Sequence, residues 1–273
     1  MSGWFLALVR LAPGRFGMTL GVSHRRKAAL RATLLQAAWN YDRMQNLGWA
    51  FCVEPALRQL YPDPALRAKA LRRHLELFNT HPYLASYVLG AALRAEAQAV
   101  EGMGSVDAVS ALKSGLSPAL AAVGDSFFWA NLRPAAGLLG VVWLWLAPHP
   151  WQLAAPLVFL AVYNLPSLPL RLRGVGVGWA KGEAVAVHVA SMDLPAKAEG
   201  IRRAALVLVA GLAGSLARLK YPVGGGRPPL ADNFLFLGAG LIMLLLLRLG
   251  VRPVVLLVLC VLAALVLALA IPQ

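Results

Sequence analysis

The chain has 273 residues, of which 59% are apolar and only 14% are charged, and its mean hydropathy is +0.64. An average soluble domain is about 45–50% apolar and about 25% charged. This composition therefore excludes a disordered chain and argues against an ordinary soluble enzyme. The formal net charge is +14. In an integral membrane protein such an excess indicates cytoplasmic loops and contact with anionic membrane lipids, and we expect no nucleic-acid partner.

Residues 1–104 are predicted to form a cytoplasmic or interfacial amphipathic helical region. The first apolar stretch, at 4–9, is too short for a secretory signal, and Arg10 and Arg15 follow it. Basic residues recur throughout the region, and their excess favours a cytoplasmic location.

One helix within this region has clear start and stop signals. Asp63 followed by Pro64 is typical of a helix start, and apolar residues then recur at helical spacing up to Phe78. The His-Pro pair at 81–82 disfavours continuation, so we expect the helix to end near Asn79. Its basic face suits either a membrane surface or ordinary solvent.

The segment 105–133 combines small residues, a proline and a single carboxylate among aromatic residues. It is too rich in Gly and Pro to span a membrane simply, so we expect a candidate re-entrant hairpin with Asp125 near its tip. A tight turn in which Asp125 caps the next helix is an equally good interpretation.

Residues 134–273 are predicted to form the transmembrane helical region, with apolar runs at 134–147, 153–170, 204–219, 234–247 and 253–271. A span needs about 20 residues, so only the last run crosses a bilayer without extension. The first two runs indicate a hairpin that turns at 148–150, and the prolines within the second run indicate a broken helix. The predicted fold class is an all-α integral membrane protein, with an amphipathic and re-entrant helical N-terminal half followed by about five transmembrane helical segments.

The motifs of nucleotide, metal and nucleophile chemistry are missing from the sequence. Glycines alternate at 174–178 without the spacing of a dinucleotide-binding loop. His74, Glu76 and His81 do not have the spacing of a zinc protease, and the two cysteines have no partner motif. We therefore expect no metal, no cofactor and no catalytic residue.

A polar cluster at 39–46 stands out against the apolar background. It places amide side chains and a carboxylate beside tryptophan. Amides and a carboxylate can bind sugar hydroxyls while an aromatic ring covers the apolar side of a pyranose. A helix turn or partner interface held together by the amides is the alternative.

Four longer stretches carry a resemblance to a known family: AWNYDRMQNLGWAFCVEPALRQLYP at 38–62, LRRHLELFNTHPYLA at 71–85, AVGDSFFWANLRP at 122–134 and NLPSLPLRLRGVGVGWAKG at 164–182. Together with the paired C-terminal apolar runs, they resemble the IID subunit of the mannose/fructose/sorbose family of sugar phosphotransferase system permeases. The resemblance covers nearly the whole chain.

This resemblance implies a function and a set of partners. A IID subunit pairs with a IIC membrane subunit to form the sugar pathway, as a multi-pass protein of the bacterial cytoplasmic (inner) membrane. Phosphate passes from phosphoenolpyruvate to the cytoplasmic IIA and IIB components, and the hexose is phosphorylated as it is delivered. IID itself is a non-catalytic permease subunit in that scheme, and the family implies a multimer of IIC–IID pairs.

The chemistry and the resemblance together predict the residues nearest the sugar path: Trp39, Asn40, Asp42, Gln45, Asn46, Asn79, His81 and Asp125. Their expected roles are hydrogen bonding to hydroxyls and setting a conformational gate. The chain also departs from the family pattern, since GLSPALAAVGD at 115–125 has fewer glycines than is usual. The alternative is therefore a degenerate IID-like scaffold or regulatory subunit that does not transport sugar. A membrane enzyme acting on lipid-linked substrate has no catalytic constellation to support it.

Overall fold

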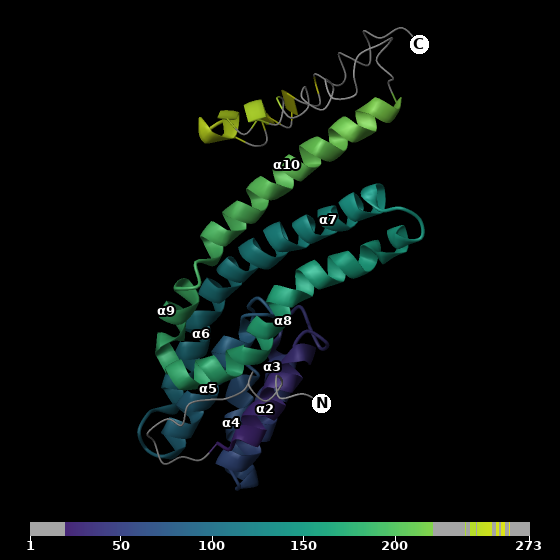
Figure 1. Cartoon of the computed structure of the whole chain (residues 1–273). Coiled ribbons are helices and arrows are strands. Elements are labelled where there is room, and N and C mark those ends of the chain that lie inside the picture. The colour runs from purple at the N-terminus through teal and green to yellow at the C-terminus, as the bar shows by residue number, and fades with distance from the viewer. Residues whose placement is uncertain are drawn as a thin grey trace, which may run out of the picture. The chain divides into compact units, whose positions relative to one another are not determined.

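The computed structural model describes residues 20–220 and parts of 238–262. Within residues 20–220 the chain is helical, with two isolated bridges and no extended strand. An all-α fold was expected, and it is confirmed. The elements are α2 (Val22–Arg31), η1 (Ala32–Leu34), α3 (Asn46–Leu60), α4 (Pro64–His74), α5 (Ala85–Val100), α6 (Val106–Gly124), η2 (Asp125–Leu132), α7 (Arg133–Leu146), η3 (Trp151–Ala154), α8 (Ala155–Lys181), η4 (Gly182–Ala184), α9 (Val185–Ala190) and α10 (Leu194–Lys220) (Figure 1).

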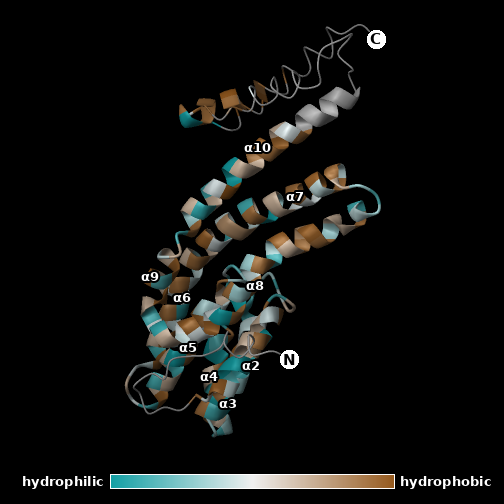
Figure 2. Cartoon of the chain, viewed as in Figure 1, coloured by the Kyte–Doolittle hydropathy of each residue, from teal (hydrophilic) through white to brown (hydrophobic). Residues whose placement is uncertain are grey.

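The chain divides into two compact units. The first comprises Met1–Ala136 and Pro156–Ala198, and the second comprises Gly137–Ala155 and Glu199–Gln273. The apolar residues are unevenly spread along the helices: α7 and the start of α8 are largely hydrophobic, whereas α2 to α4 mix both kinds (Figure 2). The expected division at 1–104, 105–133 and 134–273 concerns placement relative to a membrane and stays a prediction.

Helix α4 begins as the sequence predicts and ends earlier. The Asp63 carboxylate accepts hydrogen bonds from the amides of Ala65 (2.7 Å) and Leu66 (3.4 Å), and Pro64 is the first helical residue. The helix stops at His74 instead of continuing to Asn79. The segment after it, 75–80, pairs with the loop 39–46. This tertiary pairing replaces the last helical turn.

Helices α5 and α8 approach each other backbone to backbone. A Cβ atom added at Gly90 of α5 would lie 2.1 Å from the carbonyl oxygen of Val175, and one at Gly178 of α8 would lie 2.1 Å from that of Tyr87. Gly174 and Gly178, which belong to the stretch that does not match a nucleotide loop, therefore serve helix packing. Arg94 of α5 completes the contact by donating to the carbonyl of Ala180 at 2.8 Å, near the end of α8.

The segment 105–133 does not turn back at Asp125. Ser105 caps the start of α6 by accepting from the amide of Ala108 (3.1 Å), and the helix then continues through η2 and α7 from Val106 to Leu146. The expected hairpin is replaced by one long helix whose middle part, η2, is a π-helix. A π register accommodates extra residues without ending the helix, so the Gly and Pro signals do not become a turn.

The turn expected at 148–150 is present, but the helix after it is not broken. Helix α7 ends before Pro148, and the Trp143 indole N–H donates to the Trp151 carbonyl (2.8 Å) across the turn. Helix α8 then runs unbroken past Pro166 and Pro169. Each proline removes one backbone hydrogen bond, and α8 absorbs this by bending (Figure 1).

Two helical stretches are long and apolar enough to cross a membrane, Val106–Leu146 and Trp151–Leu212. They contain the first three predicted runs, wholly or in large part. Half of the predicted run at 234–247 and most of the predicted run at 253–271 lie outside the described residues.

Because α5 and α8 meet through glycine, we predict that Gly178→Ala destabilises the protein by about 1–3 kcal/mol, as overpacking does. The matched change Gly200→Ala on α10, where an added Cβ meets no heavy atom within 4 Å, should be neutral or stabilising by up to about 1 kcal/mol. Thermal unfolding of the purified protein in detergent measures both. Equal melting temperatures for the two variants would contradict the close packing.

Candidate functional site

The amide side chains of the 39–46 cluster are used inside the chain. Asn40 donates to the Asn46 side-chain oxygen (2.8 Å) and accepts from the Arg43 amide (2.8 Å). Asn46 donates to the Leu75 carbonyl (2.9 Å), and the buried Gln45 donates to the Thr80 carbonyl (2.8 Å). Two of the predicted sugar ligands, Gln45 and Asn46, thus hold the loop to the segment 75–80, and Asn40 bonds within the loop.

Other side chains of this loop point outward. Trp39 is 44% exposed and packs edge-on against Tyr41, which is 89% exposed, with ring centroids 4.8 Å apart. Asp42 is exposed and forms a 3.2 Å ion pair with Arg43. Because both side chains are exposed to solvent, this ion pair is weak. Trp39 and Asp42 are the members of the predicted cluster that remain accessible.

The segment 75–80 connects this loop to helix α6. The Thr80 amide donates to the Gln45 side-chain oxygen (3.2 Å), and the Thr80 hydroxyl donates to the Ser117 carbonyl of α6 (2.9 Å). Asn79, directly before Thr80 in the segment 75–80, is exposed. Gln45 thus bonds to the residue between Asn79 and His81, and both its side-chain oxygen and its side-chain nitrogen are used by Thr80.

His81 is fully buried against the helix that carries Asp125. Its ring stacks on Phe128 (centroids 4.7 Å apart, planes at 13°) and meets Trp129 edge-on at 4.8 Å. An added Cβ at Gly124 would lie 2.3 Å from the His81 Cβ, so glycine is needed there. His81 thus packs where α6 changes to the π-helical η2, a kind of segment often found at functional sites.

The protonation of His81 follows from its surroundings. Burial, and then the positive charge of Arg171, lowers the pKa of His81 to about 3, so the ring is neutral at physiological pH. Its Nδ1 accepts from the Tyr83 amide (3.3 Å), which places the proton on Nε2. That Nε2–H has no hydrogen-bond partner among the described residues.

Two charges lie exposed in the middle part of the helix Val106–Leu146, beyond Asp107 in its first turn. Asp125 and Arg133 are both exposed, and Trp129, 42% exposed, lies between them in sequence. Neither charge has an ion-pair partner within the described part of the chain. A charged side chain at the centre of a bilayer costs about 2.5–3.5 kcal/mol on insertion scales, and such residues face protein or water instead of lipid.

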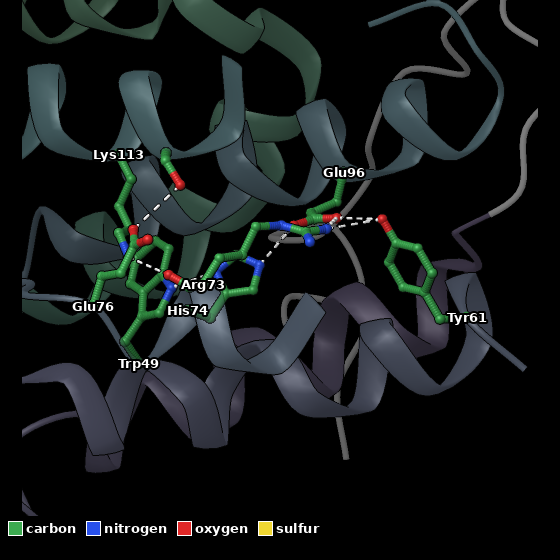
Figure 3. Close-up of polar contacts among 8 residues, drawn as sticks. Trp49, Tyr61, Arg73, His74, Glu76, Glu96 and Lys113 are labelled. Carbon is green, nitrogen blue, oxygen red and sulfur yellow. Dashed lines mark hydrogen bonds and ion pairs between the residues drawn. The ribbon is translucent and has the colours of Figure 1, made fainter. Parts of the chain in front are cut away.

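A second polar group, centred on the buried Glu96 of α5, was not predicted (Figure 3). Arg73 binds both oxygens of this carboxylate (2.9 and 2.7 Å), while Tyr61 donates at 2.7 Å and His74 lies at 2.8 Å. Burial alone would raise the pKa of Glu96, but these hydrogen bonds lower it to about 2. The Glu96 cluster joins α3, α4 and α5, so its visible role is to hold three helices together.

His74 has a single possible tautomer within this cluster. The Trp49 indole N–H can only donate, and it does so to His74 Nδ1 at 3.0 Å. The His74 proton therefore lies on Nε2 and is donated to Glu96. Burial lowers the pKa of His74, which agrees with a neutral ring.

The sequence contained one weak signal for this cluster. Glu96 is the lone carboxylate of a largely apolar helical stretch, LGAALRAEAQAV, and a carboxylate buried there needs a partner. Among the described residues, no group of three or more His, Cys, Asp or Glu is placed to hold a metal ion.

Helices of membrane-spanning length and exposed charges on one of them indicate a helical membrane protein. The sequence profile of the mannose/fructose/sorbose family IID component of the phosphotransferase system matches residues 19–271. The chain belongs to this family and is a IID membrane component of a sugar phosphotransferase system.

Individual relatives agree with the profile. The mannose-specific EIID component of Escherichia coli K12 is 36% identical over 196 residues, which cover 71% of this chain and 68% of that protein. The fructose permease IID component of Bacillus subtilis 168 is 30% identical over 196 residues, covering 71% and 70%. The sorbose-specific EIID component of Klebsiella pneumoniae is 30% identical over 205 residues, covering 75% and 73%.

Two solved structures have the same fold. A chain of the mannose transporter ManYZ, determined by cryo-electron microscopy in complex with microcin E492, has a TM-score of 0.57 and 31% identity, with 93% of this chain and 98% of that chain covered. A structure described as a membrane protein has a TM-score of 0.62 and 30% identity, with 91% and 97% covered.

We predict that Glu96→Gln destabilises the protein by about 3–5 kcal/mol at pH 7, because it leaves the guanidinium of Arg73 without its charge partner. The pKa of Glu96 is lowered in the folded state from its ordinary 4.5 to about 2. Its stabilising effect is therefore full above about pH 4.5 and is lost as the pH falls towards 2.

The measurement is the melting temperature of wild type and Glu96→Gln in detergent across this pH range. The gap between them should narrow as the pH falls. Glu101→Gln, which changes an exposed carboxylate without an ion pair in the described residues, should leave the melting temperature nearly unchanged. A gap that stays constant down to pH 2.5 would disprove the assignment of the charge to Glu96.

Proposed function

We propose that this chain forms, with a IIC membrane subunit, the pathway by which a hexose of the mannose class enters a bacterial cell. It does so as a multi-pass protein of the inner membrane, in a multimer of IIC–IID pairs. Cytoplasmic IIA and IIB components relay phosphate from phosphoenolpyruvate, and the sugar is phosphorylated on delivery. The mannose, fructose and sorbose specificities named for the relatives support this substrate class.

The observation that carries the proposal is the match of the family profile to residues 19–271. Accessible polar and aromatic side chains within these residues add to it. Of the predicted site residues, these keep side chains exposed to a ligand or partner: Trp39, Asp42, Asn79 and Asp125. We assign the sugar-facing role to this subset. The loop 39–46 is held in place by the side chains of Asn40, Gln45 and Asn46. His81 packs against the buried side of the η2 segment.

The chain itself acts as a permease subunit without chemistry of its own. Two of its five histidines, His74 and His81, are buried and neutral, which suits packing and not phosphoryl transfer. In this proposal the phosphate is carried only by the IIA and IIB components.

We predict that sugar uptake depends on this chain. The test uses a host without its own mannose-type permease that expresses the cognate IIC, IIA and IIB, with and without this chain. Labelled mannose, fructose, glucosamine and sorbose are scored for uptake and for phosphorylation inside the cell. Uptake only in the presence of the chain supports the proposal and identifies the sugar. No uptake of any sugar, with a stable IIC complex still recovered, would instead support a scaffold or regulatory subunit.

We also predict that Trp39→Ala lowers sugar uptake about tenfold while the recovery of IIC stays unchanged, because it removes an aromatic face worth about 0.5–1.5 kcal/mol together with its covered area. The matched control is Trp151→Ala, which truncates another exposed tryptophan at the α7–α8 turn, 65% exposed. A normal initial rate for Trp39→Ala at subsaturating sugar would remove the 39–46 loop from the sugar path.

A further inference from the structure

One residue of the 39–46 loop has an unusual backbone conformation. Met44 has a φ of +59°, in the left-handed region that residues with a Cβ atom rarely adopt. Among the described residues, Asp193, with a φ of +48°, is the other non-glycine residue in this region. Aspartate is enriched in this conformation, so Met44 is the more unusual of the two. Strain of this kind persists only where the surrounding structure fixes the backbone, and it is concentrated at functional sites.

Hydrogen bonds on both sides of Met44 hold its backbone in place. The Met44 carbonyl accepts from the backbone amide of Asn40 (3.0 Å) and from its side chain (3.3 Å). The Arg43 carbonyl accepts from the Phe78 amide (3.4 Å), and the Gln45 amide donates to the Phe78 carbonyl (2.8 Å). The two peptide groups that flank Met44 are thus both paired, with Asn40 and with Phe78.

The left-handed turn lets these two sets of hydrogen bonds form together. The bonds to Asn40 close the turn 40–44, and the bonds to Phe78 pair the loop with the segment 75–80. At an ordinary helical φ, the two peptide groups flanking Met44 would be rotated relative to each other by about 120°. One of the two sets would then be lost, so the conformation of Met44 is what joins the closed turn to its neighbouring segment.

We propose that Met44 is a positioning residue for sugar binding, and that its left-handed backbone holds Trp39 and Asp42 in the orientation that binds the hexose. Both are sugar-facing residues of this loop in the proposed function. The pairing with Phe78 also fixes the residue directly before Asn79, the sugar-facing residue of the segment 75–80. One turn thereby sets the relative position of side chains from two segments. This inference rests on the proposed function, because it concerns the residues assigned to the sugar.

The proposal assigns the role to the backbone of Met44 and not to its side chain, which is half-buried. Substitutions at this one position separate the two possibilities. Glycine adopts the left-handed region without steric cost, whereas a β-branched residue such as valine is strongly disfavoured there. Met44→Gly therefore removes the side chain and keeps the backbone conformation, and Met44→Val disfavours the backbone conformation.

The test measures uptake against sugar concentration in the host that expresses cognate IIC, IIA and IIB. For Met44→Gly we expect a KM within about twofold of wild type, since the left-handed turn is retained. For Met44→Val we expect KM to rise about tenfold, because about a tenth of the molecules then hold the loop in the binding-competent form. Maximal uptake per molecule in the membrane should stay unchanged, because saturating sugar restores that form.

The matched control is Asp193→Val, which places valine at the other left-handed position, between α9 and α10. It should leave KM unchanged even where it lowers the amount of folded protein. A purely structural role for Met44 would likewise lower maximal uptake without changing KM. An unchanged KM for Met44→Val, or an equal rise in KM for Met44→Gly or for Asp193→Val, would overturn the proposal.

A milder variant covers the case in which Met44→Val is not recovered in the membrane. Met44→Ala also carries a Cβ atom and disfavours the left-handed region less than valine does, so its KM should rise about threefold. A KM equal to that of Met44→Gly would overturn the proposal, because the two variants differ only in this backbone preference.

A failure of this inference is distinguishable from a failure of the proposed function. Wild type without uptake of any sugar would refute the permease role, and the positioning role with it. Normal uptake by wild type with an unchanged KM in Met44→Val would leave the permease role intact and refute the positioning role alone.

Trypsin cleavage after Arg43, whose side chain is 54% exposed, gives a second readout that needs no sugar. In the purified full-length protein, cleavage should be about tenfold faster in Met44→Val than in Met44→Gly, because the loop opens more often. Equal cleavage rates would show that the turn does not depend on the conformation of Met44 and would overturn the proposal.

Discussion

The arrangement of the first unit depends on one buried amide. Gln45 bonds the backbone of Thr80 at both its N–H and its carbonyl, and the Thr80 hydroxyl reaches the Ser117 carbonyl on α6. These three hydrogen bonds, together with that from Asn46 to the Leu75 carbonyl, link the 39–46 loop, the 75–80 segment and α6. A buried amide left unpaired costs about 1–3 kcal/mol. Displacement of the 75–80 segment would therefore destabilise the protein, because it would leave the Gln45 side chain without hydrogen-bond partners.

Directly after Thr80, the same arrangement places His81 against Gly124. The imidazole occupies space that a Cβ would need, and the helix changes there from α to π register. The exposed residues Asp125 and Trp129 follow from that point. The position of Asp125 is therefore linked to the packing of His81, more than 40 residues away in sequence. The contacts between them are made by the neutral His81 ring.

The Glu96 cluster solves a different problem, which is how to bury a carboxylate. Arg73 supplies the opposite charge, and Tyr61 and His74 satisfy the remaining oxygen positions. Trp49 in turn fixes the proton of His74. The family resemblance pointed to the stretches that contain Tyr61, Arg73 and His74, but their convergence on one carboxylate from a third helix was not visible in the sequence.

The sequence by itself determined the class of protein, the family, the start of α4 at Asp63 and the turn at 148–150. These depend on composition and on local backbone chemistry, which neighbouring residues specify. Only the tertiary structure decided that α4 ends at His74, that α8 continues past Pro166 and Pro169, and that 105–133 continues as a helix. Only it decided, too, that Asn40, Gln45 and Asn46 support a loop while Asp125 stays exposed. The physical reason is that an amide or a carboxylate has the same hydrogen-bonding capacity towards a sugar, a backbone group or a partner subunit, and the partner within reach is chosen by the fold.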